Sequence, residues 1–299
     1  MSAGSMGAVG VIGLGIMGSA MASNLAKAGF EVIGTDILPE ARAALSKAGG
    51  KPVASSAEVG KGCRRIIISV ASEAALSQVC DELAASCAKG TIVMETGTLP
   101  LAAKQKARTL LAGKGVTLLD CTLSGTGAQA RVKDLAVYAS GEADAIKQMA
   151  PIVDGFARVC YDLGEFGNGT KMKFVTNLLV AIHNVATAEA ILFGIRSGLD
   201  SEMVLKVIGD GAGSSRMLQV RGPVMARRTW DQPAATNTLF QKDMKLIGEA
   251  LQAAQCPAPL FSACIPIYTA AMASGHAEHD LAAVYEILER MARRPEGKQ

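Results

Sequence analysis

A lysine and an asparagine stand four residues apart near the start of a long apolar segment. At this spacing Lys173 and Asn177 share one face of a helix, and Asn184 falls close to the same stripe. Burying an unpaired polar group costs about 1–3 kcal/mol, so this stripe requires water or polar partners. A lysine placed there can take a proton from a reacting hydroxyl or return it, and burial would move its pKa toward neutrality. The alternative is an ordinary solvated lysine near a helix start.

A second cluster of candidate residues is a glycine-rich loop near the N-terminus. Gly13, Gly15 and Gly18 follow the pattern G-x-G-x-x-G between a β-branched run and a helical pattern. The first glycine permits a tight turn, the second lets a pyrophosphate approach the backbone, and the third lets helix and strand pack closely. The helix N-terminus supplies N–H groups and partial positive charge to the phosphates. The predicted cofactor-binding loop comprises Gly13, Gly15, Ile16, Met17 and Gly18.

An acid follows this loop at the end of the next β-branched run. A carboxylate at Asp36 accepts hydrogen bonds from both ribose hydroxyls of a dinucleotide and would repel a 2′-phosphate. The sequence therefore predicts NAD as the cofactor, with NADP as the alternative. The competing interpretation is that Asp36 only caps the helix expected from Pro39.

These residues need a sheet to position them, and the first half of the chain has the required alternation. Short β-branched runs alternate with helical patterns such as 39–47, 73–87 and 99–112. This predicts a mostly parallel sheet covered by helices on both faces, a Rossmann-type α/β domain. The expected strands are Val9–Ile12, Glu31–Thr35, Arg65–Val70, Thr91–Met94, Val116–Asp120, Leu135–Ala139 and Arg158–Asp162.

The second half has only helical periodicity, which predicts an all-α C-terminal domain. The strand signals stop after about Gly164, so we expect a dinucleotide-binding domain at 1–165 and a helical substrate and oligomerisation domain at 166–299. The expected helices are 168–197, 200–210, 239–254, 258–274 and 279–293, with breaks at 198–200, 221–223, 256–259 and 273–280.

Composition excludes several classes of function. The formal net charge is only +3 and aromatic residues make up 4%, so neither a nucleic-acid surface nor a membrane surface is expected. The seven cysteines include no C-x-x-C pair, which favours free thiols and a cytoplasmic location. The N-terminal residues lack the pattern of a signal peptide. Cys121 has no base near it in sequence, so no nucleophile is predicted there.

The three histidines give no firm ligand set. His183 is interpreted as a packed core residue. His276, His279 and Asp280 could suggest a metal, but their spacing is not diagnostic, and a turn with a helix cap is the preferred interpretation. No metal site is predicted.

Four segments in order resemble one known family. They are GLGIMGSAMASNLAKAG (13–29), DCTLSGTGAQARVKDL (120–135), GNGTKMKFVTN (167–177) and FQKDMKLIGEA (240–250). Together they resemble the β-hydroxyacid dehydrogenases, which include 3-hydroxyisobutyrate dehydrogenase, tartronate semialdehyde reductase and, more distantly, 6-phosphogluconate dehydrogenase. The resemblance covers nearly the whole chain. It implies an enzyme that acts on a small hydroxyacid. The large apolar helical domain separately predicts a homodimer or homotetramer.

The resemblance also implies roles for matching residues. The family's catalytic lysine, in the pattern G-x-x-x-K-x-x-N-N, falls on Lys173, and its second asparagine, which binds substrate, falls on Asn177. The family's Ser or Thr near the nicotinamide ribose falls on Thr98, and its K-D motif near the cofactor falls on Lys242 and Asp243. The family loop D-x-P-V-S-G-G, which holds the substrate carboxylate, matches 120–126 and gives Ser124, Gly125 and Thr126 as substrate-binding residues.

Four positions depart from the family pattern. Thr176 replaces the first asparagine, Thr122 replaces the proline, Thr126 replaces the second glycine, and Lys133 stands where a glycine is usual. The added bulk and hydroxyl of Thr126 predict a reshaped carboxylate site that suits a more hydroxylated acid.

The leading hypothesis is an NAD-dependent dehydrogenase that moves a hydride between nicotinamide and a short 3-hydroxyacid, or reduces the matching semialdehyde. Lys173 serves as its general acid or base. One alternative is a catalytically silent NAD(P)H-binding sensor or scaffold, which the presence of Lys173 disfavours. Another is an imine reductase-like enzyme, a class that usually replaces this lysine.

Overall fold

The computed structural model describes residues 7–292 of the chain. The chain divides into two compact units, with the boundary between Lys173 and Phe174. This boundary lies inside one long helix, because the first residues of that helix are bound by the strands of the N-terminal unit.

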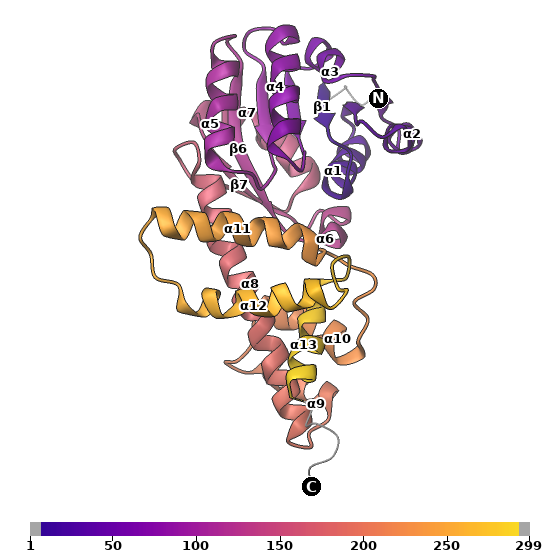
Figure 1. The fold of residues 1–299 in the computed structure, drawn as a ribbon. Coiled ribbons are helices and arrows are strands. Elements are labelled where there is room, and N and C mark those ends of the chain that lie inside the picture. The colour runs from indigo at the N-terminus through magenta and orange to yellow at the C-terminus, as the bar shows by residue number, and fades with distance from the viewer. Residues whose placement is uncertain (1–6, 293–299) are drawn as a thin grey trace. The chain divides into compact units, whose positions relative to one another are not determined.

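The N-terminal unit contains one sheet of eight strands in the order β3-β2-β1-β4-β5-β6-β7-β8 (Figure 1). All neighbouring strands are parallel except β6 and β7, so the predicted mostly parallel sheet is confirmed. The strands are β1 Ala8–Ile12, β2 Glu31–Thr35, β3 Lys51–Pro52, β4 Arg65–Ile68, β5 Ile92–Glu95, β6 Thr117–Ser124, β7 Ala136–Ser140 and β8 Val159–Asp162.

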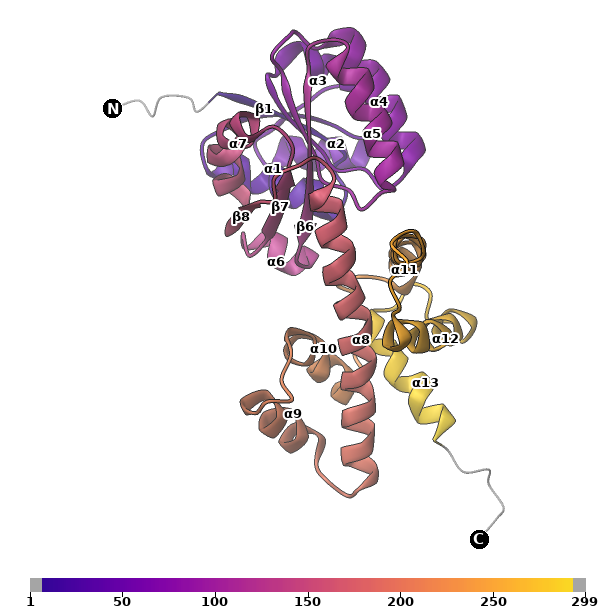
Figure 2. The ribbon, with the colours of Figure 1, turned by 90° about the vertical axis from the view of Figure 1, so that its left-hand side faces the viewer.

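Helices cover both faces of this sheet, as the strand–helix alternation predicted. Figure 2 shows α4 and α5 on one side of the strands and α1 and α7 on the other. The helices are α1 Ile16–Lys27, α2 Pro39–Lys47, α3 Ser56–Gly62, α4 Glu73–Ser86, α5 Leu101–Ala112, α6 Gly127–Arg131 and α7 Ala143–Phe156.

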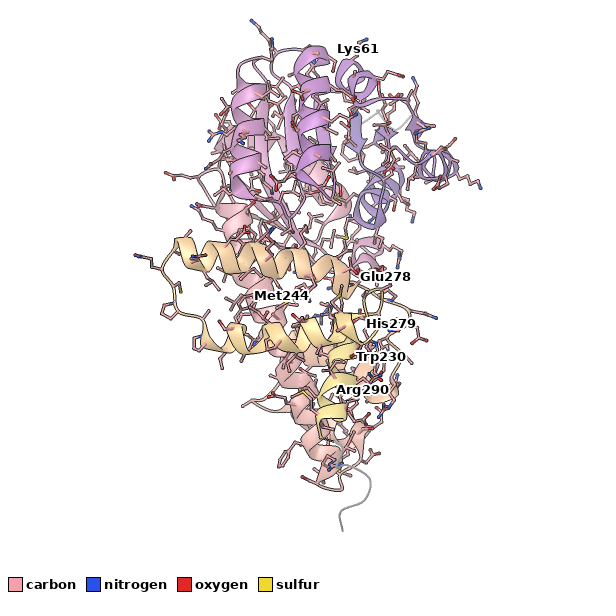
Figure 3. All side chains as sticks on the ribbon, in the orientation of Figure 1. Lys61, Trp230, Met244, Glu278, His279 and Arg290 are labelled. Atoms are coloured by element: carbon pink, nitrogen blue, oxygen red, sulfur yellow. The ribbon has the colours of Figure 1, made fainter. Side chains whose placement is uncertain are left out.

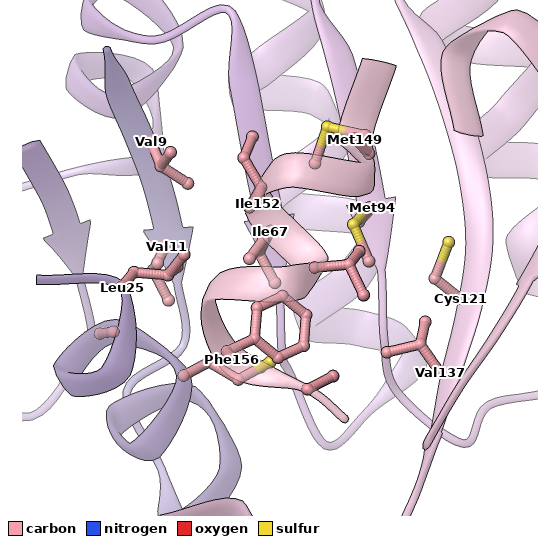
Figure 4. Packing of buried hydrophobic residues seen from close by; sticks show 14 of the residues in the cluster. Val9, Val11, Leu25, Ile67, Met94, Cys121, Val137, Met149, Ile152 and Phe156 are labelled. Atoms are coloured by element: carbon pink, nitrogen blue, oxygen red, sulfur yellow. The ribbon is translucent and has the colours of Figure 1, made fainter. Parts of the chain in front are cut away.

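The core divides into two layers because successive strand residues point to opposite faces. In β4, Ile67 packs in one cluster, whereas Ile66 and Ile68 pack in the other. The first cluster joins the sheet to α1 and α7 through side chains that include Leu25 and Phe156 (Figure 4). The second cluster joins the sheet to α3, α4 and α5. Burial on both faces explains the uninterrupted apolar runs of these strands.

Strand β6 is longer than the expected strand at 116–120. Its antiparallel pairing with β7 continues beyond Asp120 as far as Ser124. The segment expected to be a substrate-binding loop is therefore mostly strand. The chain turns only at Gly125, whose φ of +138° favours glycine.

The C-terminal unit is helical, as predicted. Helix α8 contributes buried residues such as Ala181, Ala188 and Ile191 to a core that includes Phe240 and Tyr268. The aromatic rings of the last two residues lie 5.4 Å apart between centroids. The elements are α8 Asn168–Arg196, α9 Ser201–Asp210, α10 Arg216–Arg227, α11 Asn237–Ala253, α12 Pro259–Ala273, the 3-10 turn η1 Leu281–Ala283 and α13 Val284–Met291.

The predicted break at the sequence RGP is wrong, because these three residues lie inside α10. Gly222 serves packing rather than a turn, since a β-carbon there would lie 2.5 Å from Leu205 of α9. The buried Arg221 side chain pairs with Asp280 at 3.0 Å and anchors the helix. Tertiary contacts therefore hold a helix that contains Pro223, against its local preference.

Helix α8 is also long and apolar enough to span a membrane by length and composition, with a mean hydropathy of 1.8 over its most apolar window. Its buried side chains, however, form the centre of the C-terminal core. This is the arrangement of a core helix in a globular domain.

Three described residues other than glycine have a positive φ: Lys133, Arg228 and Gln255. Lys133, just after α6, has φ of +62°, a left-handed conformation that costs roughly 1–2 kcal/mol for a residue with a β-carbon. We expect Lys133→Gly to raise the free energy of unfolding by about 0.5–1 kcal/mol in urea denaturation, after the greater entropy of glycine in the unfolded chain is subtracted. The neighbouring exposed Val132 has a negative φ, so Val132→Gly should not stabilise the protein. Equal effects of the two substitutions would contradict the strain argument.

Candidate active site

The glycine loop lies where the order of strands reverses. Strand β1 pairs with β2 on one side and with β4 on the other, and ligands of doubly wound sheets bind at this switch point. A β-carbon on Gly13 would lie 2.2 Å from the Ser69 carbonyl oxygen, and one on Gly18 would lie 1.8 Å from the Gly13 carbonyl oxygen. A β-carbon on Gly15 would have no heavy atom within 4 Å. The first and third glycines are thus required by packing, whereas the second leaves open space.

Helix α1 begins directly at this loop. Its N-cap, Gly15, has no side chain to cap the helix, and its first turn contains no acidic residue. Helix geometry leaves the first N–H groups without intrahelical partners, so they suit an anionic phosphate. Ile16 is exposed and Met17 is half-buried in this first turn. The loop therefore fits the pyrophosphate of a dinucleotide.

Asp36 is held beside the glycine loop by its carboxylate. Its Oδ2 accepts a hydrogen bond from the Leu14 N–H at 2.6 Å, and its Oδ1 accepts one from the Leu38 N–H at 2.9 Å. The second bond lies at the start of α2, so the residue stabilises that turn as well. The Arg42 side chain donates to the Asp36 backbone carbonyl. Asp36 is therefore oriented by both neighbouring segments.

The predicted substrate loop follows the carboxyl end of β6. Ser124 is the last residue of that strand, and Thr126 is the N-cap of α6. Gly125 between them is required, because a β-carbon there would lie 2.6 Å from Leu135. Thr98 also follows a carboxyl end, that of the parallel neighbour β5. The ends of parallel strands share one edge of a sheet, so the predicted cofactor and substrate segments lie along the same edge.

Lys173 is anchored to this substrate loop. Its ammonium nitrogen Nζ donates a hydrogen bond to the Leu123 carbonyl oxygen at 2.7 Å. Leu123 immediately precedes Ser124 in β6. The structure thus brings the predicted proton-transfer group to the predicted substrate-binding segment, although the two are distant in sequence.

In the C-terminal unit, Asp243 joins two other predicted residues. Asn177, which is 7% exposed, donates from Nδ2 to Asp243 Oδ2 at 2.9 Å. Lys242 Nζ lies 3.2 Å from Asp243 Oδ1. The K-D motif in the sequence identified Asp243. The hydrogen bond between Asp243 and Asn177 could not be predicted from the sequence alone. This bond orients the amide of Asn177.

Comparisons with known proteins agree with this arrangement. Residues 8–164 match the family model of the NAD binding domain of 6-phosphogluconate dehydrogenase. Residues 167–288 match the model described as NAD-binding of NADP-dependent 3-hydroxyisobutyrate dehydrogenase. L-threonate dehydrogenase of Cupriavidus necator is 32% identical over 283 residues, which cover 93% of this chain and 95% of that protein. The chain belongs to the β-hydroxyacid dehydrogenase family.

Two further relatives support the same assignment. The 2-hydroxy-3-oxopropionate reductase of Escherichia coli strain K12 is 31% identical over 290 residues, covering 95% of this chain and 98% of that protein. A crystal structure of 3-hydroxyisobutyrate dehydrogenase from Salmonella typhimurium has a TM-score of 0.85 and 29% identity, covering 94% of this chain and 99% of that chain. The protein is therefore an NAD(P)-dependent oxidoreductase of the β-hydroxyacid dehydrogenase family.

Two departures from the family pattern have local structural roles. The buried Thr122 hydroxyl donates to the Gly169 carbonyl oxygen at 2.8 Å, a bond that proline could not make. The Thr126 hydroxyl accepts from the Gln129 N–H at 3.3 Å, while the Gln129 side chain accepts from the Thr126 N–H at 3.0 Å. This reciprocal pair is a capping box, which stabilises the start of α6. Whether Thr126 also selects the substrate stays a prediction.

Asn184 has a structural role instead of a catalytic one. It is fully buried and donates to the Tyr268 hydroxyl at 3.0 Å and to the Leu281 carbonyl oxygen at 2.9 Å. The polar residues of α8 therefore lie in two different environments. Lys173 and Asn177 lie near its start, and Asn184 holds the helical core together.

The histidine pair near the last helix is also internal to the C-terminal unit. His276 Nδ1 lies 2.9 Å from His279 Nδ1, and the ring centroids of His276 and Trp230 lie 6.1 Å apart. Figure 3 labels His279 and Trp230. Burial lowers the pKa of His276 below its usual value, and the charge of Glu286 opposes this. Asp280 caps η1 through the Ala282 N–H at 3.0 Å. Within residues 7–292 no group of three metal-ligating side chains occurs.

The cysteine beside the substrate segment is buried in the sheet. Burial raises the pKa of Cys121 well above its usual value, and the charge of Asp120 adds to the effect. The thiol is therefore protonated at neutral pH, whereas a cysteine nucleophile reacts as the thiolate.

Proposed function

We propose that the protein is an NAD-dependent dehydrogenase of a short, hydroxylated 3-hydroxyacid, or a reductase of the matching semialdehyde, with Lys173 as the general acid or base. The observation that carries this proposal is the 2.7 Å hydrogen bond from Lys173 Nζ to the Leu123 carbonyl oxygen. It places an amine capable of proton transfer at the residue before Ser124, in the segment proposed to bind the substrate carboxylate.

In the proposed reaction, the hydride and the hydroxyl proton of the substrate go to different acceptors. NAD, when bound, supplies the nicotinamide carbon that accepts the hydride from the hydroxyl-bearing carbon. In that direction Lys173 acts as the neutral amine and takes the hydroxyl proton, and in reduction its ammonium group returns the proton to the carbonyl oxygen. The bond to Leu123 fixes the amine so that little orientational freedom is lost at the moment of transfer.

Substrate binding is assigned to the residues that match the substrate-binding motifs of the family. The carboxylate is assigned to Ser124, Gly125 and Thr126, and Asn177 is assigned a hydrogen bond to the substrate. Asp243 holds one N–H of the Asn177 amide, so the amide orientation is set before substrate binds. The relatives named L-threonate dehydrogenase make L-threonate the first acid to test.

The preference for NAD over NADP is assigned to Asp36. Its carboxylate is fixed beside the glycine loop by Leu14 and Leu38, where it would accept ribose hydroxyls and repel a 2′-phosphate. Thr98 and Lys242 are assigned to the nicotinamide side of the cofactor. The N-terminal domain at 1–165 is thus proposed to bind the dinucleotide.

We also propose that the helical domain at 166–299 forms a homodimer or homotetramer in the cytoplasm. Large apolar side chains are exposed at the end of α8 and along α9, including Phe193, Leu199, Met203 and Val207. Grouped exposed apolar side chains of this kind mark protein interfaces. The cysteines are free thiols, which suits a reducing compartment.

Replacement of the proposed acid–base residue tests the function. We expect Lys173→Met to lower kcat by about 10²–10⁴-fold, because general acid–base catalysis contributes a factor of this size. The measurement is NADH formation with L-threonate, glycerate, 3-hydroxyisobutyrate and 6-phosphogluconate, each with NAD and with NADP.

The matched control for that test is the exposed neighbour Lys171, whose replacement by methionine should leave turnover unchanged. NADH binding, followed by fluorescence, should persist in both variants. Full turnover by Lys173→Met would contradict the assigned role. NADH binding without turnover of any acid by the unmodified protein would instead support the sensor hypothesis.

Cofactor choice is tested at Asp36. We expect Asp36→Asn to raise the ratio of kcat/KM for NADP to that for NAD about tenfold or more, since the repulsion of the 2′-phosphate is removed. Glu31→Gln, at the exposed start of the same strand, should leave the ratio unchanged. An unchanged ratio in Asp36→Asn would show that another residue discriminates between the cofactors.

The assembly is tested by sedimentation velocity. We expect the unmodified protein to sediment as a dimer or tetramer and Val207→Lys to shift it toward smaller species, because a charge would be buried at the interface. Val132→Lys places the same charge on an exposed valine of the N-terminal unit and should cause no shift. A monomeric unmodified protein would exclude the proposed assembly.

A further inference from the structure

The first turn of α8 receives its hydrogen-bond acceptors from the sheet. The Gly169 N–H donates to the Ser140 hydroxyl at 3.0 Å, and the Thr170 N–H donates to Asp120 Oδ2 at 2.7 Å. Asp120 and Ser140 are direct cross-strand partners of β6 and β7. These side chains satisfy N–H groups that helix geometry leaves without intrahelical partners. The start of the helix is thus fixed to the strands that lead to Ser124.

A buried lysine binds the other side of Asp120. Lys104 of α5 has no exposed side-chain surface, and its Nζ lies 2.7 Å from Asp120 Oδ1, 2.6 Å from Glu95 Oε2 and 2.7 Å from the Gly97 carbonyl oxygen. The contacts with Asp120 and Gly97 are hydrogen bonds, and the contact with Glu95 is an ion pair. Lys104 therefore joins the end of β5 to the middle of β6.

The two segments that meet at Lys104 each lead to a proposed active-site residue. Gly97 directly precedes Thr98, and its N–H donates to Glu95 Oε1 at 2.7 Å. On the other side, the Thr170 hydroxyl donates to Asp120 Oδ1 at 2.8 Å. Thr170 lies three residues before Lys173, on the same side of α8 within one turn.

Stability by itself does not account for this buried charge. Burial alone lowers the pKa of Lys104, but the carboxylates of Glu95 and Asp120 outweigh it and raise that pKa above its usual value, so the lysine stays charged. A buried ion pair contributes little net stability, because the loss of hydration offsets most of the attraction. Two hydrogen bonds and an ion pair to one nitrogen do, however, fix the relative positions of the segments that supply the partners.

We propose that Lys104 is a positioning residue for the reaction, and that it acts through Asp120 and Thr170 to set the place of Lys173 and through Gly97 to set the place of Thr98. This inference rests on the proposed function. Lys104 touches neither substrate nor cofactor in this scheme. It holds the proton-transfer group and the nicotinamide-side loop in one fixed arrangement, to which the rate of reaction is sensitive.

The test uses the link that can be removed with least damage. Thr170→Val keeps the side-chain shape and removes only the hydroxyl bond to Asp120. Thr91→Val is the matched control, because Thr91 is equally buried and its hydroxyl donates to the Ala88 carbonyl oxygen at 2.7 Å, at the opposite end of β5. Both variants lose one buried hydrogen bond, and only the first breaks the link to α8.

We expect Thr170→Val to lower kcat about tenfold or more on the acid that the panel identifies, with KM for NAD changed less than about twofold. The primary deuterium isotope effect on kcat should increase and the pH profile of kcat should shift, because proton transfer to a misplaced lysine becomes slower. Thr91→Val should change neither. A smaller fraction of folded protein would lower the apparent kcat but would leave the isotope effect and the pH profile unchanged.

Amide hydrogen exchange provides a readout that needs no turnover. Exchange in the peptide 168–173 should be about tenfold faster in Thr170→Val than in the unmodified protein, and unchanged in Thr91→Val. The double variant Lys104→Met, Glu95→Gln removes the cation together with one of its two anions, and it should show the same faster exchange. If the double variant does not fold, the exchange result for Thr170→Val alone decides whether the proposal stands.

The outcomes separate this inference from the proposed function. If Lys173→Met loses turnover while Thr170→Val matches Thr91→Val in rate and exchange, Lys104 has no positioning role and the function stands. If Lys173→Met keeps turnover, the proposed function fails, and unchanged exchange at 168–173 would overturn the network as well. Faster exchange at 168–173 together with an altered isotope effect in Thr170→Val supports both the positioning role and the proposed function.

Discussion

Helix α8 begins in the protein interior, where no water is available to accept the hydrogen bonds of its first N–H groups. The sheet must therefore supply acceptors, and it does so through Asp120 in the middle of β6 and its cross-strand partner Ser140 at the end of β7. Once these bonds form, the first turn of the helix has one position relative to the strands. Lys173, one turn after Gly169 and Thr170, then reaches the Leu123 carbonyl oxygen. The location of the proposed proton-transfer group thus follows from the need to satisfy buried backbone donors.

The direction of the strands provides the rest of the arrangement. Strands β1, β2, β4, β5 and β6 are parallel, so their carboxyl ends lie along one edge of the sheet. That edge contains the glycine loop, Asp36, the segment of Thr98 and the segment of Ser124. Residues that are far apart in sequence become neighbours because each follows the end of a strand. This is the general reason why doubly wound sheets bind ligands at this edge.

Three of the four positions that depart from the family pattern have physical explanations in the fold. Thr122 bonds to Gly169 and so adds another tie between β6 and the start of α8. Thr126 caps α6 in place of a glycine, and Lys133 accepts a left-handed backbone at the other end of that short helix. All three changes concern the strand, turn and helix around the proposed carboxylate site. They alter how this segment is held while leaving Ser124 and Gly125 in place.

The sequence by itself determined the two-part architecture, the glycine loop, the acid after β2 and the family, because these depend on local periodicity and on motifs of fixed spacing. It also singled out Lys173, Asn177, Ser124 and Gly125 through that family resemblance. Only the tertiary structure showed that Lys104 is buried, since a lysine in an amphipathic helix looks solvated until its partners from other strands are known. Likewise, Gly222 and Pro223 indicated a break locally, but packing against α9 and the pair Arg221–Asp280 keep them in α10. Contacts between distant segments decided these features, and no local pattern encodes them.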